Sequence, residues 1–109
     1  MQIIDGAGVY TAAGGEPVHW AEHLRVPDLS VGTYSIPAGG TDTQTPHTED
    51  EIYVVTSGRA VIETPGGAAP VAPGSVIFVP AHEEHRFTHV TEDLALLVIF
   101  APAEESRAT

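Results

Sequence analysis

Short apolar runs, each stopped by glycine or proline, constrain the fold of this chain more than any other feature. The runs are rich in Val, Ile and Leu, are at most eight residues long, and cover residues 29–36, 51–57, 59–64, 75–79 and 94–101. Runs of this length and composition are typical of β-strands. The sequence therefore predicts an all-β domain.

The connections between these runs have the chemistry of turns. Residues 56–59 are TSGR, and residues 64–74 are TPGGAAPVAPG. Glycine adopts the positive φ angles of tight turns, and proline cannot continue a hydrogen-bonded ladder. Short strands and turns at this spacing leave no room for βαβ crossovers, so we expect a single-domain antiparallel β-barrel or jelly roll.

The chain of 109 residues has the size of one domain, and its two ends differ from its middle. Residues 1–28 mix Gly, Pro and polar residues around the stretch EPVHWAEHL, and we expect an N-terminal arm or strand there. Residues 29–101 contain the predicted barrel. The polar residues 102–109 are expected to form a C-terminal tail that frays.

The charge of the chain argues against some classes of binding partner. Fifteen acidic residues, four arginines and no lysine give a formal net charge of −11, which argues against nucleic acid and anionic membranes. The lack of cysteine excludes disulfides and thiolate metal ligands. Neither a basic segment leading into an apolar run at the N-terminus nor an apolar stretch of about 18 residues is present, so we expect a soluble cytoplasmic protein.

Histidine and glutamate side chains beside two of the runs could meet inside such a barrel. Glu51 and Tyr53 share one face of a strand, as do His85 and Phe87. If both strands line the same barrel, His47 can join Glu51 and His85. Two imidazoles and one carboxylate suit Fe(II), and also Mn, Ni or Zn, and leave positions open for substrate or water. The alternative is three unrelated residues on surface turns.

The first of these segments resembles the first motif of the small single-domain cupins. That motif is Gly, five residues, His-x-His, three or four residues, Glu, six residues and Gly. Gly39, His47, Glu51 and Gly58 stand at this spacing. Thr45 occupies the place of the motif's first histidine.

The second segment resembles the second cupin motif. That motif is Gly, five residues, Pro-x-Gly, two residues, His, three residues and Asn. Gly74, Pro80 and His85 fill their places, with His82 in place of the glycine and His89 in place of the asparagine. The spacer between the motifs is fifteen residues long, about as short as it becomes in the family.

The resemblance covers roughly residues 29–101 and implies a divalent metal bound in a cupin barrel. The implied protein ligands are His47, Glu51 and His85. Thr45 is a poor substitute for the fourth ligand. Gln44 is a candidate, because Pro46 can distort the strand and turn the neighbouring side chain inward, and an amide oxygen can bind a hard cation.

The same resemblance assigns a pocket around the metal. Its walls are expected to be Thr45, Tyr53, Phe87 and His89. His89 and His82 are further candidates for the missing ligand. In the alternative interpretation His89 is a hydrogen-bonded core residue, while His82 and Gln44 lie on solvated turns.

Two other groups of residues have plainer interpretations. Asp42, Glu49 and Asp50 form an acidic run, which we expect to be a solvated turn. Trp20 lies in the arm with two histidines, where a tryptophan serves packing or an interface more often than chemistry.

Function is open at this point, because the cupin fold carries many activities. One hypothesis is a metal-dependent enzyme of the dioxygenase or isomerase type acting on a small molecule. The other is a module that binds a small ligand without turnover, which the missing histidine at Thr45 favours. The resemblance also implies homodimers in which the N-terminal arm contacts the partner's sheet and protects an open strand edge.

Overall fold

The computed structural model describes residues 1–12 and 14–108, and its strands form one antiparallel sheet. The strands are β1 (His19–Val26), β2 (Leu29–Ile36), β3 (Asp50–Thr64), β4 (Gly67–Val71), β5 (Val76–Val79) and β6 (Arg86–Ala101). Their order is β1-β2-β6-β3-β4, and β5 pairs with β3. The predicted all-β class is confirmed. The described residues include no helix with the length and apolar character needed to cross a membrane.

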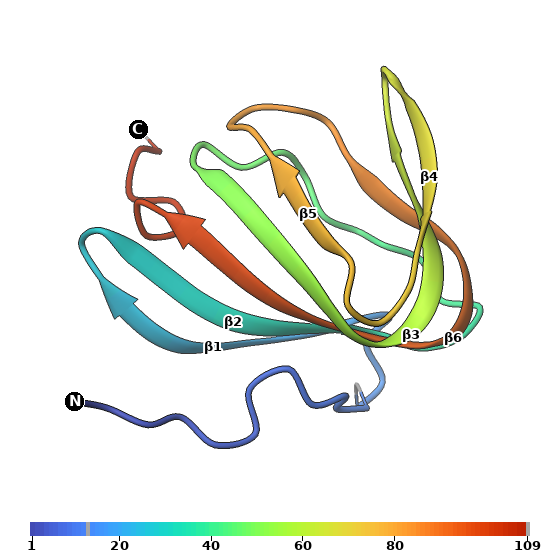
Figure 1. The fold of residues 1–109 in the computed structure, drawn as a ribbon, viewed down its shortest axis with the longest axis horizontal. Helices are drawn as coiled ribbons and strands as arrows, with labels where there is room; N and C mark the ends of the chain where they lie inside the picture. The colour runs from blue at the N-terminus through green and yellow to red at the C-terminus, as the bar shows by residue number, and fades with distance from the viewer. Residues whose placement is uncertain (13, 109) are drawn as a thin grey trace.

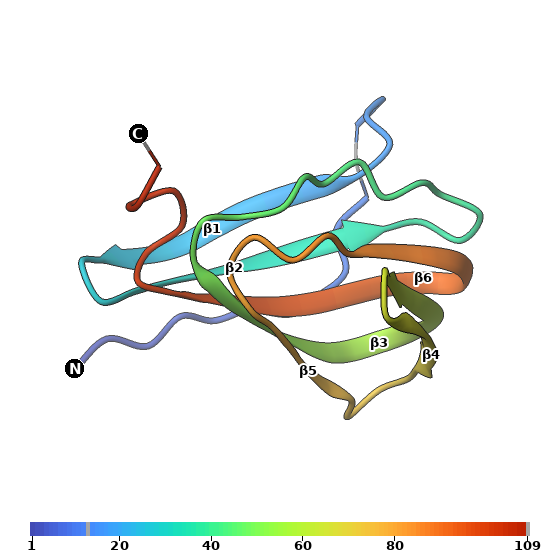
Figure 2. The ribbon, with the colours of Figure 1, turned by 90° about the horizontal axis from the view of Figure 1, so that it is seen from above.

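Two long strands, β3 and β6, give the sheet its curved, barrel-like shape. The start of β3 pairs with β5, its end pairs with β4, and β6 runs beside nearly all of it. Figure 1 shows β1, β2, β6 and β3 side by side. In Figure 2 the connection between β2 and β3, residues 37–49, runs back along the length of the sheet. This connection carries Gln44 and His47, β3 carries Glu51, and His85 directly precedes β6.

The predicted turn at residues 56–59 is wrong, because β3 continues through it. Gly58 adopts a φ of +86°, and a Cβ atom there would lie 2.2 Å from the carbonyl oxygen of Asp93. The pairing with β6 shifts register on both sides of Gly58 and then resumes. The glycine thus makes an irregularity that bends one strand, where the sequence suggested two strands.

Other strands differ less from expectation. The run 29–36 is confirmed as β2, and β5 lies within the run 75–79. The segment 64–74, expected as turn only, contains β4. Within the N-terminal residues 1–28, β1 pairs with β2 of the same chain.

The core lies on the concave face of the sheet, where alternate residues of the strands point inward. Tyr53 and Val55 of β3 are fully buried, as are their partners Val98 and Leu96 on β6. Burial of each such side chain stabilises the fold by about 1.5–3 kcal/mol. Because Glu51 has the same parity as Tyr53 and Val55, the sheet buries a carboxylate in line with its core.

The C-terminal residues pack against the sheet and do not fray as expected. Ala103 is buried, and the backbone N–H of Glu104 donates to Ser30 Oγ of β2 at 2.8 Å. The guanidinium of Arg25 on β1 donates to the carbonyl of Glu104 at 2.8 Å. This segment therefore closes over the end of the sheet near His47.

Candidate metal and ligand site

Glu51 and His85 form the deepest polar contact of the molecule. Glu51 Oε1 on β3 lies 3.2 Å from His85 Nε2, and both side chains are 1% exposed. Within the described residues, neither carboxylate oxygen of Glu51 receives a hydrogen bond of acceptable geometry. A buried carboxylate without donors is costly unless a cation compensates it. Glu51 is therefore poised for a cation.

The ring of His85 is held with one nitrogen free for coordination. Its Nδ1–H donates to the carbonyl of Glu83 at 2.9 Å, so neutral His85 carries its lone pair on Nε2, facing Glu51. Burial lowers the pKa of His85, but its contacts with Glu51 and with the Glu83 carbonyl outweigh burial and raise the pKa above 6.5. His85 thus has the tautomer that a metal ligand requires.

The hydroxyl of Tyr53 links the two sides of the site. It lies 2.9 Å from His85 Nε2, and 2.9 and 3.1 Å from the amide Nε2 and Oε1 of Gln44. Burial, followed by the charge of Glu51, raises the pKa of Tyr53 well above 10. Tyr53 is therefore a neutral hydroxyl that can donate a hydrogen bond at the centre of the site.

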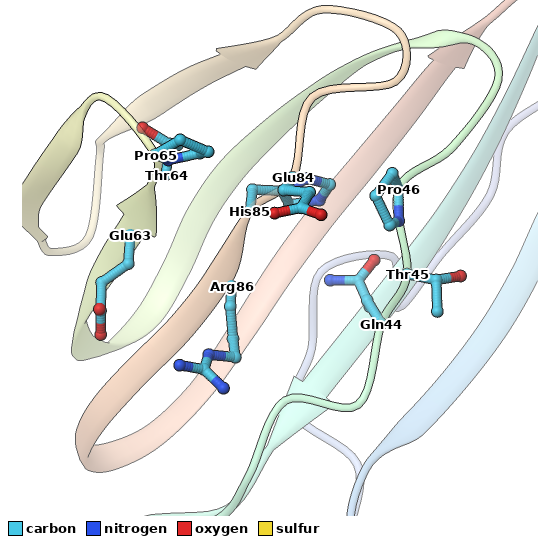
Figure 3. Close-up of a pocket in the computed structure, with 9 residues that line it drawn as sticks. All are labelled: Gln44, Thr45, Pro46, Glu63, Thr64, Pro65, Glu84, His85 and Arg86. Atoms are coloured by element: carbon cyan, nitrogen blue, oxygen red, sulfur yellow. The ribbon is translucent and has the colours of Figure 1, made fainter.

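Gln44 and Thr45 point in different directions, which bears on the missing histidine. Figure 3 shows the Gln44 amide turned toward the strand of His85 and Arg86, whereas the Thr45 side chain points away from it. Gln44 is half-buried and Thr45 is exposed. Gln44, and not Thr45, thus reaches the group around Tyr53.

Asp42 holds this part of the β2–β3 connection in place. Its carboxylate accepts hydrogen bonds from the Tyr34 hydroxyl at 2.7 Å, from the backbone N–H of Phe87 at 2.9 Å and from that of Gln44 at 3.0 Å. Asp42 is buried, so its prediction as part of a solvated turn is wrong. The sequence shows its charge but not the three donors around it.

His47 stands farther from the Glu51–His85 pair than the ligand prediction requires. Its Nε2 lies 3.3 Å from Gln44 Oε1, and its ring centroid is 6.4 Å from that of His85. The ring packs edge-on against Phe100 with centroids 4.6 Å apart. Tyr53 and Gln44 therefore bridge the two histidines.

The other nitrogen of His47 faces the C-terminal segment. Nδ1 lies 3.3 Å from Glu105 Oε1 and 3.5 Å from Glu104 Oε2. In residues 1–12 and 14–108, these three residues offer ligand atoms that all lie within 4.8 Å of one another, and the trio of His47, Glu51 and His85 does not meet that spacing. Burial raises the pKa of Glu104. Sequence analysis missed both glutamates, because nothing in a polar C-terminus indicates where it packs.

Glu49 is the second fully buried carboxylate of this region. It accepts hydrogen bonds from the Thr48 hydroxyl and from the backbone N–H groups of Glu105, at 2.6 Å, and Arg107, at 3.0 Å. Burial raises its pKa, but these donors outweigh burial, so the pKa of Glu49 lies below 4.5. Its prediction as a solvated turn residue is wrong. The inward parity that Glu49 shares with Glu51 was the available signal.

The remaining predicted pocket residues divide into two groups. Phe87 is buried against Tyr53, with ring centroids 5.0 Å apart. His89 is exposed and lies outside the group around Tyr53, because its φ of +48° breaks the alternation of β6 and turns Val90 inward instead. His82 is also exposed, although its backbone N–H donates to the carbonyl of His47 at 2.8 Å and ties the two motifs together.

Two hollows open on either side of Gln44. The larger one, about 630 Å³, is polar at its rim and is lined by Gln44, Thr45, Pro46, Glu63, Thr64, Pro65, Glu84, His85 and Arg86 (Figure 3). The smaller one, about 130 Å³, is lined by Val18, Trp20, Tyr34, Thr43, Gln44, His47, Phe100 and Glu104. Each hollow contains one of the two histidines, so a small molecule could approach the site from either side.

Known proteins share this sequence pattern and this fold. The family described as Cupin domain matches residues 32–100. An uncharacterized protein of Streptomyces coelicolor is 48% identical over 85 residues, which are 78% of this chain and 81% of that protein.

Solved structures of other proteins have a fold similar to that of this chain. A cupin superfamily protein from Desulfitobacterium hafniense has a TM-score of 0.74 at 20% identity and covers 92% of this chain and 90% of its own. KdgF from Halomonas sp. has a TM-score of 0.73 at 24% identity, covering 83% and 84%. A predicted oxalate decarboxylase from Thermotoga maritima has a TM-score of 0.67 at 23% identity, covering 78% and 80%. The chain belongs to the cupin family.

Proposed function

We propose that the protein binds one divalent metal ion (Fe, Mn, Ni or Zn) and presents it to a small molecule. The proposed ligands are His47 Nε2, Glu51, His85 Nε2 and Gln44 Oε1. The observation that carries the proposal is the buried carboxylate of Glu51, which receives no hydrogen bond from the part of the chain that the structure describes and faces His85 Nε2. Buried carboxylates of this kind are compensated by partners or by metals.

The donor set fits such an ion. Two imidazole nitrogens, a carboxylate and an amide oxygen suit borderline to hard divalent metals and fill fewer than six positions. A metal bound here would act as a Lewis acid or activate oxygen. Gln44 supplies the fourth ligand that the sequence lacks at Thr45.

The protein's own groups would orient a ligand at the open position. Tyr53 offers a neutral hydroxyl close to His85 and Gln44, and it can donate to an oxygen atom of a bound molecule. Asp42 fixes the backbone of Gln44, and the carbonyl of Glu83 fixes the ring of His85. These contacts position Gln44 and His85, whereas His47 has to move closer to the Glu51–His85 pair before all four ligands can reach one ion.

Metal titration tests this proposal directly. Calorimetric titration of chelator-treated protein with Mn(II), Fe(II) under argon, Ni(II) and Zn(II) should show one bound ion per chain. Glu51→Gln should weaken binding by at least about 100-fold, because the unpaired carboxylate is the anionic ligand. Glu63→Gln removes a glutamate at the rim of the larger hollow and serves as the matched control. Equal affinity in Glu51→Gln and wild type would sink the proposal.

Catalysis is proposed as one use of this centre. The proposed activity is of the dioxygenase or isomerase type on a small molecule, whereas one structural neighbour carries the name of another small-molecule activity, a predicted oxalate decarboxylase. The second candidate, a non-catalytic binding module, is favoured by an amide ligand in place of a histidine. Oxygen consumption with catechols, thiols and keto acids in the presence of Fe(II) separates them, since turnover that depends on Glu51 would exclude the binding module.

We also propose a homodimer formed through the N-terminal region. Strand β1 lies at one edge of the sheet order, and a free edge invites pairing with another chain. Light scattering should give the mass of a dimer. The carbonyl of Ala21 points toward β2, so the N–H of the next residue, Glu22, points toward the free edge. Glu22→Pro removes that N–H and should shift the mass toward the monomer. An unchanged dimer in a folded Glu22→Pro variant would locate the interface elsewhere.

A further inference from the structure

We propose that the C-terminal segment, residues 102–108, belongs to the metal site, with Glu104 and Glu105 as positioning residues for His47. The inference rests on the proposed function, in which His47 Nε2 is a ligand. Both carboxylates face the opposite ring nitrogen, at 3.5 and 3.3 Å from Nδ1. Nε2 faces only the neutral amide oxygen of Gln44, at 3.3 Å, which is a weaker acceptor than a carboxylate, so the two charged groups favour the proton on Nδ1 and leave the Nε2 lone pair for an ion.

The segment is anchored independently of these two side chains. The backbone N–H groups of Glu105 and Arg107 donate to Glu49, and that of Glu104 donates to Ser30. Ala103 is 2% exposed. The anchors act through the backbone, so the carboxylates of Glu104 and Glu105 are free to serve another purpose. Their shared partner is His47.

His47 needs this support more than His85 does. His85 is bound by a backbone carbonyl two residues earlier and directly precedes β6. His47 lies on the β2–β3 connection, outside any strand, where the described contacts of its ring are Phe100, Gln44 and the two glutamates. Removal of the two glutamates would leave Nδ1 of His47 without a described hydrogen-bonding partner, so that side of the ring would no longer fix the tautomer or the ring angle.

The first test reads the tautomer in metal-free protein. Nitrogen-15 NMR of the histidine rings, measured at alkaline pH, should show the Nδ1–H form of His47 for wild type. Glu104→Ala/Glu105→Ala should move His47 toward the Nε2–H form. Glu104→Gln/Glu105→Gln should restore the Nδ1–H form, since an amide oxygen still accepts a hydrogen bond. Glu16→Ala/Glu92→Ala loses the same two charges at exposed positions that line neither hollow and should leave the tautomer unchanged.

The second test measures Zn(II) affinity of the same variants. The double alanine variant should bind about 10- to 100-fold more weakly than wild type, with the double glutamine variant in between and the control near wild type. Thermal unfolding and backbone amide spectra identify any variant that has lost the fold. Such a variant is replaced by the single substitutions Glu104→Ala and Glu105→Ala.

Two outcomes would overturn the inference. One is an unchanged His47 tautomer in the double alanine variant. The other is loss of Zn(II) binding in that variant but not in Glu51→Gln, which would place the ion on Nδ1 with the glutamates as direct ligands. A wild-type protein that binds no metal would refute only the proposed function, because the tautomer is measured without metal.

Discussion

Glu49 and Glu51 are both 1% exposed and stand two residues apart, yet their surroundings are opposite. Glu49 has three hydrogen-bond donors and ties the C-terminal segment to the sheet. Glu51 has none within the described residues and faces His85. A satisfied buried carboxylate stabilises a fold, whereas an unsatisfied one costs stability that a bound cation can recover. The contrast separates Glu49, which holds the fold together, from Glu51, which we propose as a metal ligand.

Replacing Glu49 should have the largest effect on stability. Glu49→Ala leaves two backbone N–H groups and a hydroxyl without their acceptor, so the free energy of unfolding should fall by about 2–4 kcal/mol. Urea unfolding of metal-free protein measures the change. A loss below about 0.5 kcal/mol would show that the C-terminal segment is held by other contacts. Glu49 would then not differ from Glu51 as a structural residue.

Replacing Glu51 should change the free energy of unfolding in the opposite direction from replacing Glu49. In metal-free protein at a pH above the raised pKa of His85, Glu51→Gln removes an unpaired charge, and the free energy of unfolding should rise by about 1 kcal/mol. The same urea experiment reports it. Destabilisation as large as that of Glu49→Ala would mean that Glu51 is structural as well.

The pH dependence of metal binding sharpens the role of Glu51. The pKa of His85 is raised above 6.5, so its stabilising contact with Glu51 is fully present below pH 6.5 and is lost as the pH rises through the folded-state pKa. Metal binding requires neutral His85, so metal affinity should rise over this same window. Calorimetry between pH 6 and 9 checks the trend. In Glu51→Gln the rise should move to lower pH, and no movement would assign the raised pKa to another cause.

The smallest effect is expected where the sequence motif suggests the largest. Thr45→His restores the family's first histidine, but the side chain at this position points away from His85 (Figure 3), so metal affinity should change by less than about 3-fold. Gln44→His should strengthen Zn(II) binding by about 10-fold, because an imidazole at that position reaches the site. Calorimetry on the two variants compares neighbouring positions. The reverse ranking would mean that metal binding rearranges the connection.

The sequence predicted the fold and the pair of strands that carry the site, because alternation and Gly/Pro turns are local signals. It placed Glu51, Tyr53 and Phe87 on the buried face, where they lie. It failed at Gly58, where a positive φ bends a strand that the pattern divides in two. Local patterns do not distinguish a bulge from a turn when glycine permits both.

Sequence analysis missed the polar residues that support the site for a different reason. Asp42 and Glu49 are acidic residues in an acidic run, and their burial depends on donors from distant segments: Tyr34 and Phe87 for one, Glu105 and Arg107 for the other. Such contacts join residues that are far apart along the chain. The metal ligands themselves remain predictions from the cupin motifs until an ion is measured.

Trp20 gives these experiments an internal reporter. It is the chain's single tryptophan and is 37% exposed. Its ring packs edge-on with Tyr34 and Phe100 and lies against Gly32. It lines the smaller hollow together with Gln44 and His47. A molecule that enters this hollow must change the polarity around one indole. Occupancy can therefore be followed by the emission of the unlabelled protein, and quenching by Ni(II) would register metal arrival a few side chains away.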